Sequence, residues 1–165
     1  MNRLICSNLF ATFTLLFMAK KVLQLDLAAD FHLWALVSPL RDYRLVYFLN
    51  KLTGLDLRRL RDHKVALPRQ QGEAAFTRYG YYDGVDHLLF YVLLNKTPQG
   101  KQFLVPEYKK VDSWLLIKGD EGDWQAPVIE KMRRMNQLQT IFPVNPLALQ
   151  SQHNLIFDDE DLHSD

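Results

Sequence analysis

The sequence predicts an α+β domain in which an antiparallel meander sheet of about five to seven strands carries two helices packed on one face. Two stretches have the spacing of amphipathic helices, residues 39–53 and a segment that begins at Ala126 or Pro127. Between them, short apolar runs are separated by turn residues, and the dipeptide Asp83-Gly84 is typical of a hairpin. Because neighbouring strands joined by hairpins run in opposite directions, this order indicates an antiparallel sheet.

Length and composition indicate one ordinary globular domain. The chain has 165 residues, with 48% hydrophobic, 24% charged and 12% aromatic residues, so a sizeable core can form. The formal net charge is only +1, which gives no general attraction to nucleic acid or anionic lipid. The single cysteine, Cys6, excludes a disulfide within the chain and a four-cysteine zinc site, and it suits a reducing cytoplasm.

The first 17 residues are apolar and differ in character from the rest of the chain. We interpret residues 1–17 as a doubtful extension, a start-site artefact, with the true start at Met18 just before Lys20 and Lys21. Two alternatives are a membrane signal or anchor and a structural helix. The segment is short for a membrane span, which needs about 20 apolar residues, and we expect membrane association only if it is genuine. Residues 18–157 are expected to form the single domain.

The first elements after Met18 differ in how clearly they are marked. Residues 22–27 alternate apolar and polar side chains and predict a strand, whereas residues 30–37 are ambiguous between strand and helix. Residues 39–53 predict a helix with Ser38 as N-cap and Pro39 at the first position. Its buried stripe is expected at Leu45, Phe48, Leu49 and Leu52, and Gly54 is expected to end it.

The middle of the chain predicts a series of hairpins. Residues 64–67 form a short predicted strand, and residues 74–82 and 87–94 are predicted to pair around Asp83-Gly84. Residues 103–119 are predicted to be two apolar strands, separated by Pro106 and a charged turn at residues 107–110.

The end of the chain predicts a helix, a strand and a tail. The second helix is followed by a strand at residues 139–144, which Pro143 weakens, and by a docking piece at residues 147–157. Residues 158–165 hold five acids in eight positions and predict a disordered tail.

A motif in the middle of the chain resembles the signature of the IPExxxVDY family, small bacterial proteins of unknown function. It consists of Val105, Pro106 and Glu107, then three residues, then Val111 and Asp112. Val105 stands where the signature has isoleucine, and Ser113 stands where it has tyrosine. Residues 40–45, 50–57 and 154–157 are also similar to the family. The resemblance implies a bacterial cytoplasmic protein, and it implies no activity, ligand or site.

Glu107 and Asp112 are the sharpest candidates for chemistry. Paired carboxylates can divide acid and base roles when their surroundings separate their pKa values. The two residues flank a tight predicted turn and so can approach each other. The simpler interpretation is that both bind backbone groups or lysines at a strand end. We favour that structural role and treat an enzyme using Glu107 and Asp112 as an alternative.

A basic run offers a second alternative, a nucleic-acid-binding module. Arg58, Arg59, Arg61 and Lys64 lie close together, and tyrosines on nearby strands could supply stacking surfaces. Asp56 and Asp62 interrupt the run, however, which is more typical of a solvated loop.

Other signatures of chemistry are missing from the sequence. The five histidines show no paired metal-ligand spacing, and neither a nucleophile elbow nor a glycine-rich phosphate loop is present. A site assembled in space from His87 and distant carboxylates remains the open alternative. We therefore expect no metal, no cofactor and no catalytic residue, and we predict a non-enzymatic cytoplasmic domain that binds a protein partner.

Overall fold

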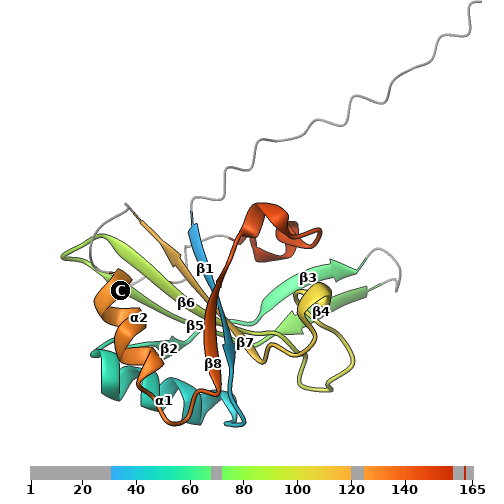
Figure 1. Cartoon of the computed structure of the whole chain (residues 1–165). Helices are drawn as coiled ribbons and strands as arrows, with labels where there is room; N and C mark the ends of the chain where they lie inside the picture. The colour runs from blue at the N-terminus through green and yellow to red at the C-terminus, as the bar shows by residue number, and fades with distance from the viewer. Residues whose placement is uncertain (1–30, 68–71, 120–124, 158–161, 163–165) are drawn as a thin grey trace, which may run out of the picture.

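The computed structural model describes residues 31–67, 72–119, 125–157 and 162 (Figure 1). Within these residues, eight strands, two α-helices and three 3-10 turns follow one another. In order they are β1 (Phe31–Val37), α1 (Asp42–Thr53), β2 (Arg58–Arg59), β3 (His63–Leu67), β4 (Gly72–Phe76), β5 (Arg78–Asp83), β6 (Leu88–Leu94), η1 (Pro106–Tyr108), β7 (Ser113–Lys118), α2 (Gln125–Arg133), β8 (Thr140–Val144), η2 (Pro146–Ala148) and η3 (Gln152–Leu155).

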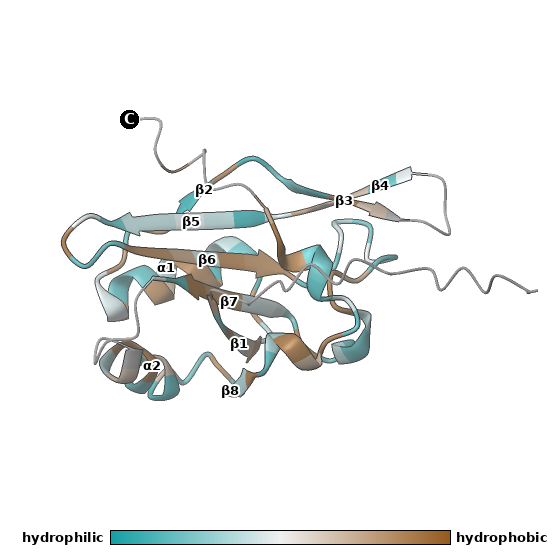
Figure 2. Ribbon diagram, turned by 90° about the horizontal axis from the view of Figure 1, so that it is seen from above, coloured by the Kyte–Doolittle hydropathy of each residue, from teal (hydrophilic) through white to brown (hydrophobic). Residues whose placement is uncertain are grey.

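Six strands form one antiparallel sheet, and β3 and β4 form a small second sheet. The order in the large sheet is β2-β5-β6-β7-β1-β8, so β5, β6 and β7 make the predicted meander (Figure 2). β1 enters between β7 and β8, pairing Trp34 with Leu115 on one side and with Pro143 on the other. Pro143 thus lies on an edge strand, where its missing N–H is tolerated. The α+β class and an antiparallel sheet of the expected size are confirmed.

Both helices cover the same face of the large sheet (Figure 1). Leu45 and Leu49 of α1 and Met132 of α2 are at most 2% exposed and pack with Phe90 of β6 and Leu115 of β7. We call this group of side chains the helix-side cluster. Each helix has one apolar side, and both apolar sides pack on the same face of β6 and β7, so both helices lie on that face.

The opposite face is covered by pieces with less regular structure. Tyr91 and Trp114 project there and pack with Phe76 of the β3–β4 hairpin, Leu104 of the loop before η1 and Leu155 of η3. We call this group the loop-side cluster. Because β6 and β7 are buried on both faces, they are continuously apolar instead of alternating, which Figure 2 shows as solid brown along β6.

Several predicted elements are confirmed, and the start of α1 is corrected. The ambiguous residues 30–37 include β1, and Gly54 ends α1 with φ +84° and an N–H bond to the carbonyl of Asn50. The helix begins at Asp42, not at Pro39. The Ser38 hydroxyl donates to the carbonyl of Gln137 (2.9 Å) and accepts from the N–H of Leu40. It therefore ties the segment between α2 and β8 to the end of β1 and does not cap α1.

Residues 103–119 also differ from the prediction. The returning strand forms as β7, but residues 103–105 make only an isolated bridge between Phe103 and Lys96. η1 stands where the turn was expected. The predictions for residues 1–17, 22–27 and 158–165 concern parts of the chain outside the described residues, apart from Leu162. Among the helices that the structure describes, none has the length and apolar character needed to cross a bilayer.

Candidate functional site

Glu107, on η1, holds the end of the chain. Its two carboxylate oxygens accept hydrogen bonds from the backbone N–H (2.8 Å) and the hydroxyl (2.7 Å) of Ser151. Partial burial acts to raise the pKa of Glu107, but the hydrogen bonds, first among them the one from the Ser151 hydroxyl, outweigh it and lower the pKa. A carboxylate held in this way stays ionised and acts as an acceptor for the segment between η2 and η3.

Asp112, just before β7, contacts a different part of the chain. One of its oxygens accepts the backbone N–H of Ser38 at 3.0 Å, and the other lies 4.0 Å from the ammonium of Lys96. The backbone of Asp112 bonds to Leu36 and Asn95. The two carboxylates therefore serve separate contacts, Glu107 to the end of the chain and Asp112 to the exit of β1. The enzymatic use of this pair remains a prediction.

The residue that organises the motif is Asn95, which sequence reasoning missed. Its fully buried amide donates to the carbonyls of Tyr108 and Val111, both at 2.9 Å. Its carbonyl oxygen accepts from the N–H of Val105 (2.9 Å) and from the indole N–H of Trp114 (3.0 Å). All four side-chain hydrogen-bonding positions are thus used. In the sequence, Asn95 reads as an ordinary turn residue after β6, and only its apolar neighbours hint at burial.

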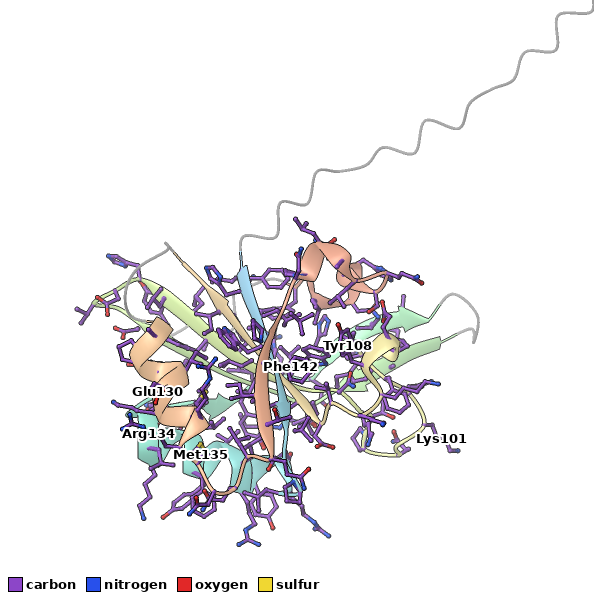
Figure 3. All side chains as sticks on the ribbon, viewed as in Figure 1. Lys101, Tyr108, Glu130, Arg134, Met135 and Phe142 are labelled. Carbon is purple, nitrogen blue, oxygen red and sulfur yellow. The ribbon has the colours of Figure 1, made fainter. Side chains whose placement is uncertain are left out.

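The apolar positions of the motif anchor the loop in the loop-side cluster. Val105 is 0% and Val111 2% exposed, whereas Pro106 begins η1 at the surface. The ring of Tyr108 packs edge-on against Trp114 and lies 6.4 Å from Phe142 of the edge strand (Figure 3). The loop is therefore fixed by buried apolar side chains and by the hydrogen bonds that the carboxylates of Glu107 and Asp112 accept.

The basic run lies at the other edge of the sheet. Arg58 pairs with Asp56 at 2.7 Å, Arg59 pairs with Asp62, and Lys64 lies 3.7 Å from Glu73. These local pairs lower the density of positive charge that a nucleic acid would meet. Arg61 is exposed beside them. Nucleic-acid binding by residues 58–64 stays a prediction, and the ion pairs with Asp56, Asp62 and Glu73 weaken the electrostatic argument for it.

His87 and His63 make separate contacts. The His87 ring nitrogen Nδ1 lies 2.9 Å from the Tyr82 hydroxyl, and His63 is buried with Nε2 2.7 Å from the carbonyl of Asn154. Burial lowers the pKa of His63, and the nearby Arg78 adds to this, while the bond to Asn154 opposes it. Within the described residues, no group of three His, Cys, Asp or Glu side chains is placed to hold a metal ion.

An open hollow of about 430 Å³ lies where β1 begins and β8 ends. It is lined by residues 31–34 and 143–146. Trp34 forms part of its wall, and the guanidinium of Arg133 from α2 lies 5.9 Å from the indole. Neither Glu107 nor Asp112 lines this hollow, so it does not provide the shared cleft that an enzyme using that pair would need.

The outward side of α1 carries an aromatic and basic surface. Tyr43 and Tyr47, one helical turn apart, are 58% and 59% exposed. Arg44 and Lys51 are exposed beside them, and the Lys51 ammonium lies 6.0 Å from the Tyr47 ring. We call these four residues the α1 surface. Large exposed aromatics at helical spacing are typical of protein interfaces.

The only acid of α1 faces away from this surface. The carboxylate of Asp42 accepts a hydrogen bond from the Tyr79 hydroxyl at 3.2 Å. Burial, together with the charge of Asp42, raises the pKa of Tyr79 to about 12, so the phenol remains a donor. With Asp42 engaged inward, the α1 surface is left with positive charge.

The chain matched no family model, no curated protein and no solved structure. The resemblance to the IPExxxVDY family therefore remains a prediction from the motif.

Proposed function

We propose that this protein is a non-enzymatic binding domain whose α1 surface docks an acidic surface of a protein partner. The observation that carries the proposal is the pair Tyr43 and Tyr47, each more than half exposed and flanked by Arg44 and Lys51. Tyrosine rings supply contact area with little loss of side-chain entropy, and the two cations select carboxylate-bearing partners.

The neighbouring helix, α2, adds positive charge that also favours an acidic partner. α2 presents Lys131 and Arg133 as exposed residues, and the exposed Arg134, which follows the helix directly, is paired to Glu130 at 3.1 Å. Figure 3 shows Glu130 and Arg134 on the helix side of the molecule, far from Lys101 at the tip of the loop before η1. The helix layer above the buried helix-side cluster is a suitable platform because its exposed residues can change without disturbing the fold.

The test is site-specific crosslinking in the cells that make this protein. A benzoylphenylalanine at Tyr47 should capture a partner with an acidic contact surface, while the same group at Val85, which is 87% exposed on the β5–β6 loop, should not. The pair of changes Arg44→Glu and Lys51→Glu should abolish the adduct and leave the melting temperature nearly unchanged, because both side chains are exposed.

Two outcomes would refute the proposal. Equal adducts from positions 47 and 85 would show that capture reflects exposure alone. An adduct that persists after both charge reversals would show that the basic residues do not select the partner.

A further inference from the structure

The segment after β8 packs on the face of the sheet opposite the helices. Residues 145–157, which include η2 and η3, bury Leu149 (7% exposed) and Leu155 (0% exposed) in the loop-side cluster (Figure 1). We call residues 145–157 the strap. The strap belongs to neither sheet, so no ladder of backbone hydrogen bonds holds it. Its attachment therefore depends on these buried leucines and on the polar side chains that join it to the rest of the fold.

Four polar side chains hold the strap against other parts of the fold. Glu107 of η1 accepts from Ser151, the Asn154 amide donates to the carbonyl of Leu104 (2.8 Å), Nε2 of His63 lies 2.7 Å from the carbonyl of Asn154, and Nζ of Lys118 lies 3.5 Å from the carbonyl of Phe157. Of these four, Glu107 and His63 are the two that titrate at acidic pH. They contact the strap from two different elements, η1 and β3, so acid can weaken its attachment at two points.

The ring of His63 lies under the strap and is 9% exposed. Because the carbonyl of Asn154 can only accept, Nε2 of His63 carries the hydrogen that lies between them. On the paired strand β4, the residue opposite His63 is the apolar Phe76, and Glu73 of the same strand pairs with Lys64. A positive charge on the imidazole would thus be buried beside an apolar neighbour.

Two cations stand near the aromatic ring that covers His63. The Phe157 ring lies 5.1 Å from the imidazole, and it also lies 4.9 Å from the guanidinium of Arg78 on β5 and 4.9 Å from the ammonium of Lys118 on β7. Burial lowers the pKa of His63, the bond to Asn154 opposes this, and the charge of Arg78 adds to the lowering. The imidazole is therefore neutral while the strap covers it, and it gains a proton more easily once water reaches it.

Glu107 responds to acid in the same direction. Partial burial acts to raise the pKa of Glu107, but hydrogen bonds from the Ser151 hydroxyl and from backbone N–H groups, including that of Gln150, outweigh it and lower the pKa. Ser151 and Gln150 belong to the strap, whereas Lys109 and Lys110 of the turn that carries Glu107 are exposed. When the strap lifts, the carboxyl loses these donors and returns toward its ordinary pKa of 4.5.

We propose that the strap is released by acid, and that His63 and Glu107 are the two groups that sense it. Opening becomes easier below pH 6.5, where the freed imidazole binds a proton, and easier again below pH 4.5, where the freed carboxyl does. Release uncovers the apolar loop-side cluster, whereas at neutral pH the strap stays shut and the domain behaves as one unit. The strap and the α1 surface lie on opposite faces of the sheet, so this proposal is independent of the function proposed for that surface.

Hydrogen exchange of the full-length protein between pH 7 and pH 4 tests the release. Protection factors, corrected for the intrinsic effect of pH on exchange, are compared for the amides of residues 147–157 and of β6. From pH 7 to pH 5 the strap should lose at least about threefold in protection, and a pKa of 6.5 for the freed imidazole limits the loss to about 25-fold. Protection should fall further below pH 4.5. At every pH the amides of β6 should remain at least about tenfold better protected than those of the strap.

Two substitutions and one matched control identify the sensing groups. His63→Gln keeps an N–H donor for the carbonyl of Asn154 but cannot titrate, so its loss of protection between pH 7 and pH 5 should be less than about twofold. Glu107→Gln should keep that first step and remove the further fall below pH 4.5. His153→Gln changes an exposed histidine of the strap itself and should follow the wild type at every pH.

Three results would overturn the proposal. Strap protection that is constant from pH 7 to pH 5, or equal to that of β6 at every pH, would show that acid does not release the strap separately. A wild-type pH profile in His63→Gln, or the loss of that profile in His153→Gln, would show that His63 is not the sensor. If His63→Gln does not fold, an NMR titration of the wild-type His63 ring replaces it, and a midpoint at or above pH 6.5 would refute the proposal.

Discussion

At the scale of single residues, the motif around Glu107 is held together by hydrogen bonds to buried or half-buried partners. The critical member is Asn95, whose amide satisfies four groups of the loop and of Trp114. A residue in this position carries more of the local stability than either carboxylate, because each of its partners is left unpaired in the interior when it is lost.

Replacement of Asn95 should therefore be among the most damaging polar substitutions. We expect Asn95→Leu to lower the free energy of unfolding by at least about 3 kcal/mol, since two carbonyls and two N–H groups lose their partners. Urea denaturation of the purified variant measures this. Asn136→Ala, at an exposed position, should change stability by less than about 0.5 kcal/mol. A cost for Asn95→Leu as small as that of the control would contradict the central role of this amide.

Glu107 should stabilise the fold in a pH-dependent way. Its folded pKa is lowered, so its contribution is complete above the ordinary value of 4.5 and is lost as the pH falls through the folded pKa. Glu107→Gln keeps one acceptor but places an NH₂ group against Ser151. The variant should be less stable than wild type at pH 7 because it loses one charged acceptor. The loss should be only about 1 kcal/mol, because Glu107 is largely exposed and water screens its charge.

Denaturant melts at pH 7 and at a series of pH values below 4.5 test this expectation. The difference between wild type and Glu107→Gln should shrink as the pH falls from 4.5 through the lowered folded pKa of Glu107, because the wild-type carboxyl then also becomes protonated. A difference that stays constant over the whole pH series would mean that the charge of Glu107 plays no part, and that only shape or packing matters.

At the scale of elements, the end of α1 depends on one glycine. Gly54 has φ +84°, and a Cβ there would meet no atom within 4 Å, so any cost of substitution comes from the backbone alone. We expect Gly54→Ala to cost about 1 kcal/mol and Gly54→Asn less, because asparagine tolerates this conformation better. Thermal unfolding of the two variants decides the ranking.

Gly84 provides the matched control. It has no positive φ, and a Cβ added there would lie 3.8 Å from its nearest neighbour, the ring of Tyr82, so Gly84→Ala should be neutral or slightly stabilising. If Gly54→Ala and Gly84→Ala behaved alike, the left-handed conformation would not be the reason that α1 ends where it does.

The elements show which sequence signals were sufficient. The predicted stripe and the Gly54 stop identified α1, although only Leu45 and Leu49 of the stripe are fully buried and Leu52 is 43% exposed. Asp83-Gly84 identified the β5–β6 hairpin. The predicted start of α1 was wrong because Ser38 bonds Gln137 across 99 positions of the chain, and a local capping rule cannot include such a partner. Residues 103–105 look like a strand because they are apolar, but their burial comes from the loop-side cluster and Asn95, not from a sheet.

At the scale of the whole molecule, two apolar clusters share one sheet. β6 and β7 contribute alternate side chains to the helix-side and the loop-side cluster, so neither cluster can melt without removing support from the other. The α+β class could be predicted because it depends on the spacing of apolar residues within each segment, which differs between helices and strands. The insertion of β1 between β7 and β8 could not, since partners of a strand far apart in the chain leave no local signal.

The shared strands predict cooperative unfolding. Leu49→Ala in the helix-side cluster and Leu155→Ala in the loop-side cluster should each cost about 2–5 kcal/mol. Both variants should still unfold in a single transition, with the same midpoint by far-UV circular dichroism and by tryptophan fluorescence. Separate midpoints for the two probes in either variant would show that the two faces of the sheet are independent units.

The enclosure of β6 has a consequence for the behaviour of the protein at high concentration. Its sequence, LLFYVLL, has the high β-propensity, lack of charge and lack of proline that favour fibril formation. In the folded chain β5 and β7 flank it and side chains cover both faces, while Pro143 interrupts the outer border of the sheet at β8. Fraying of the ends therefore leaves this segment hidden, and self-assembly must wait for unfolding of the entire domain. The shelf life of the protein is then set by its rate of global unfolding, and a substitution that speeds unfolding should shorten it even where the equilibrium stability hardly changes.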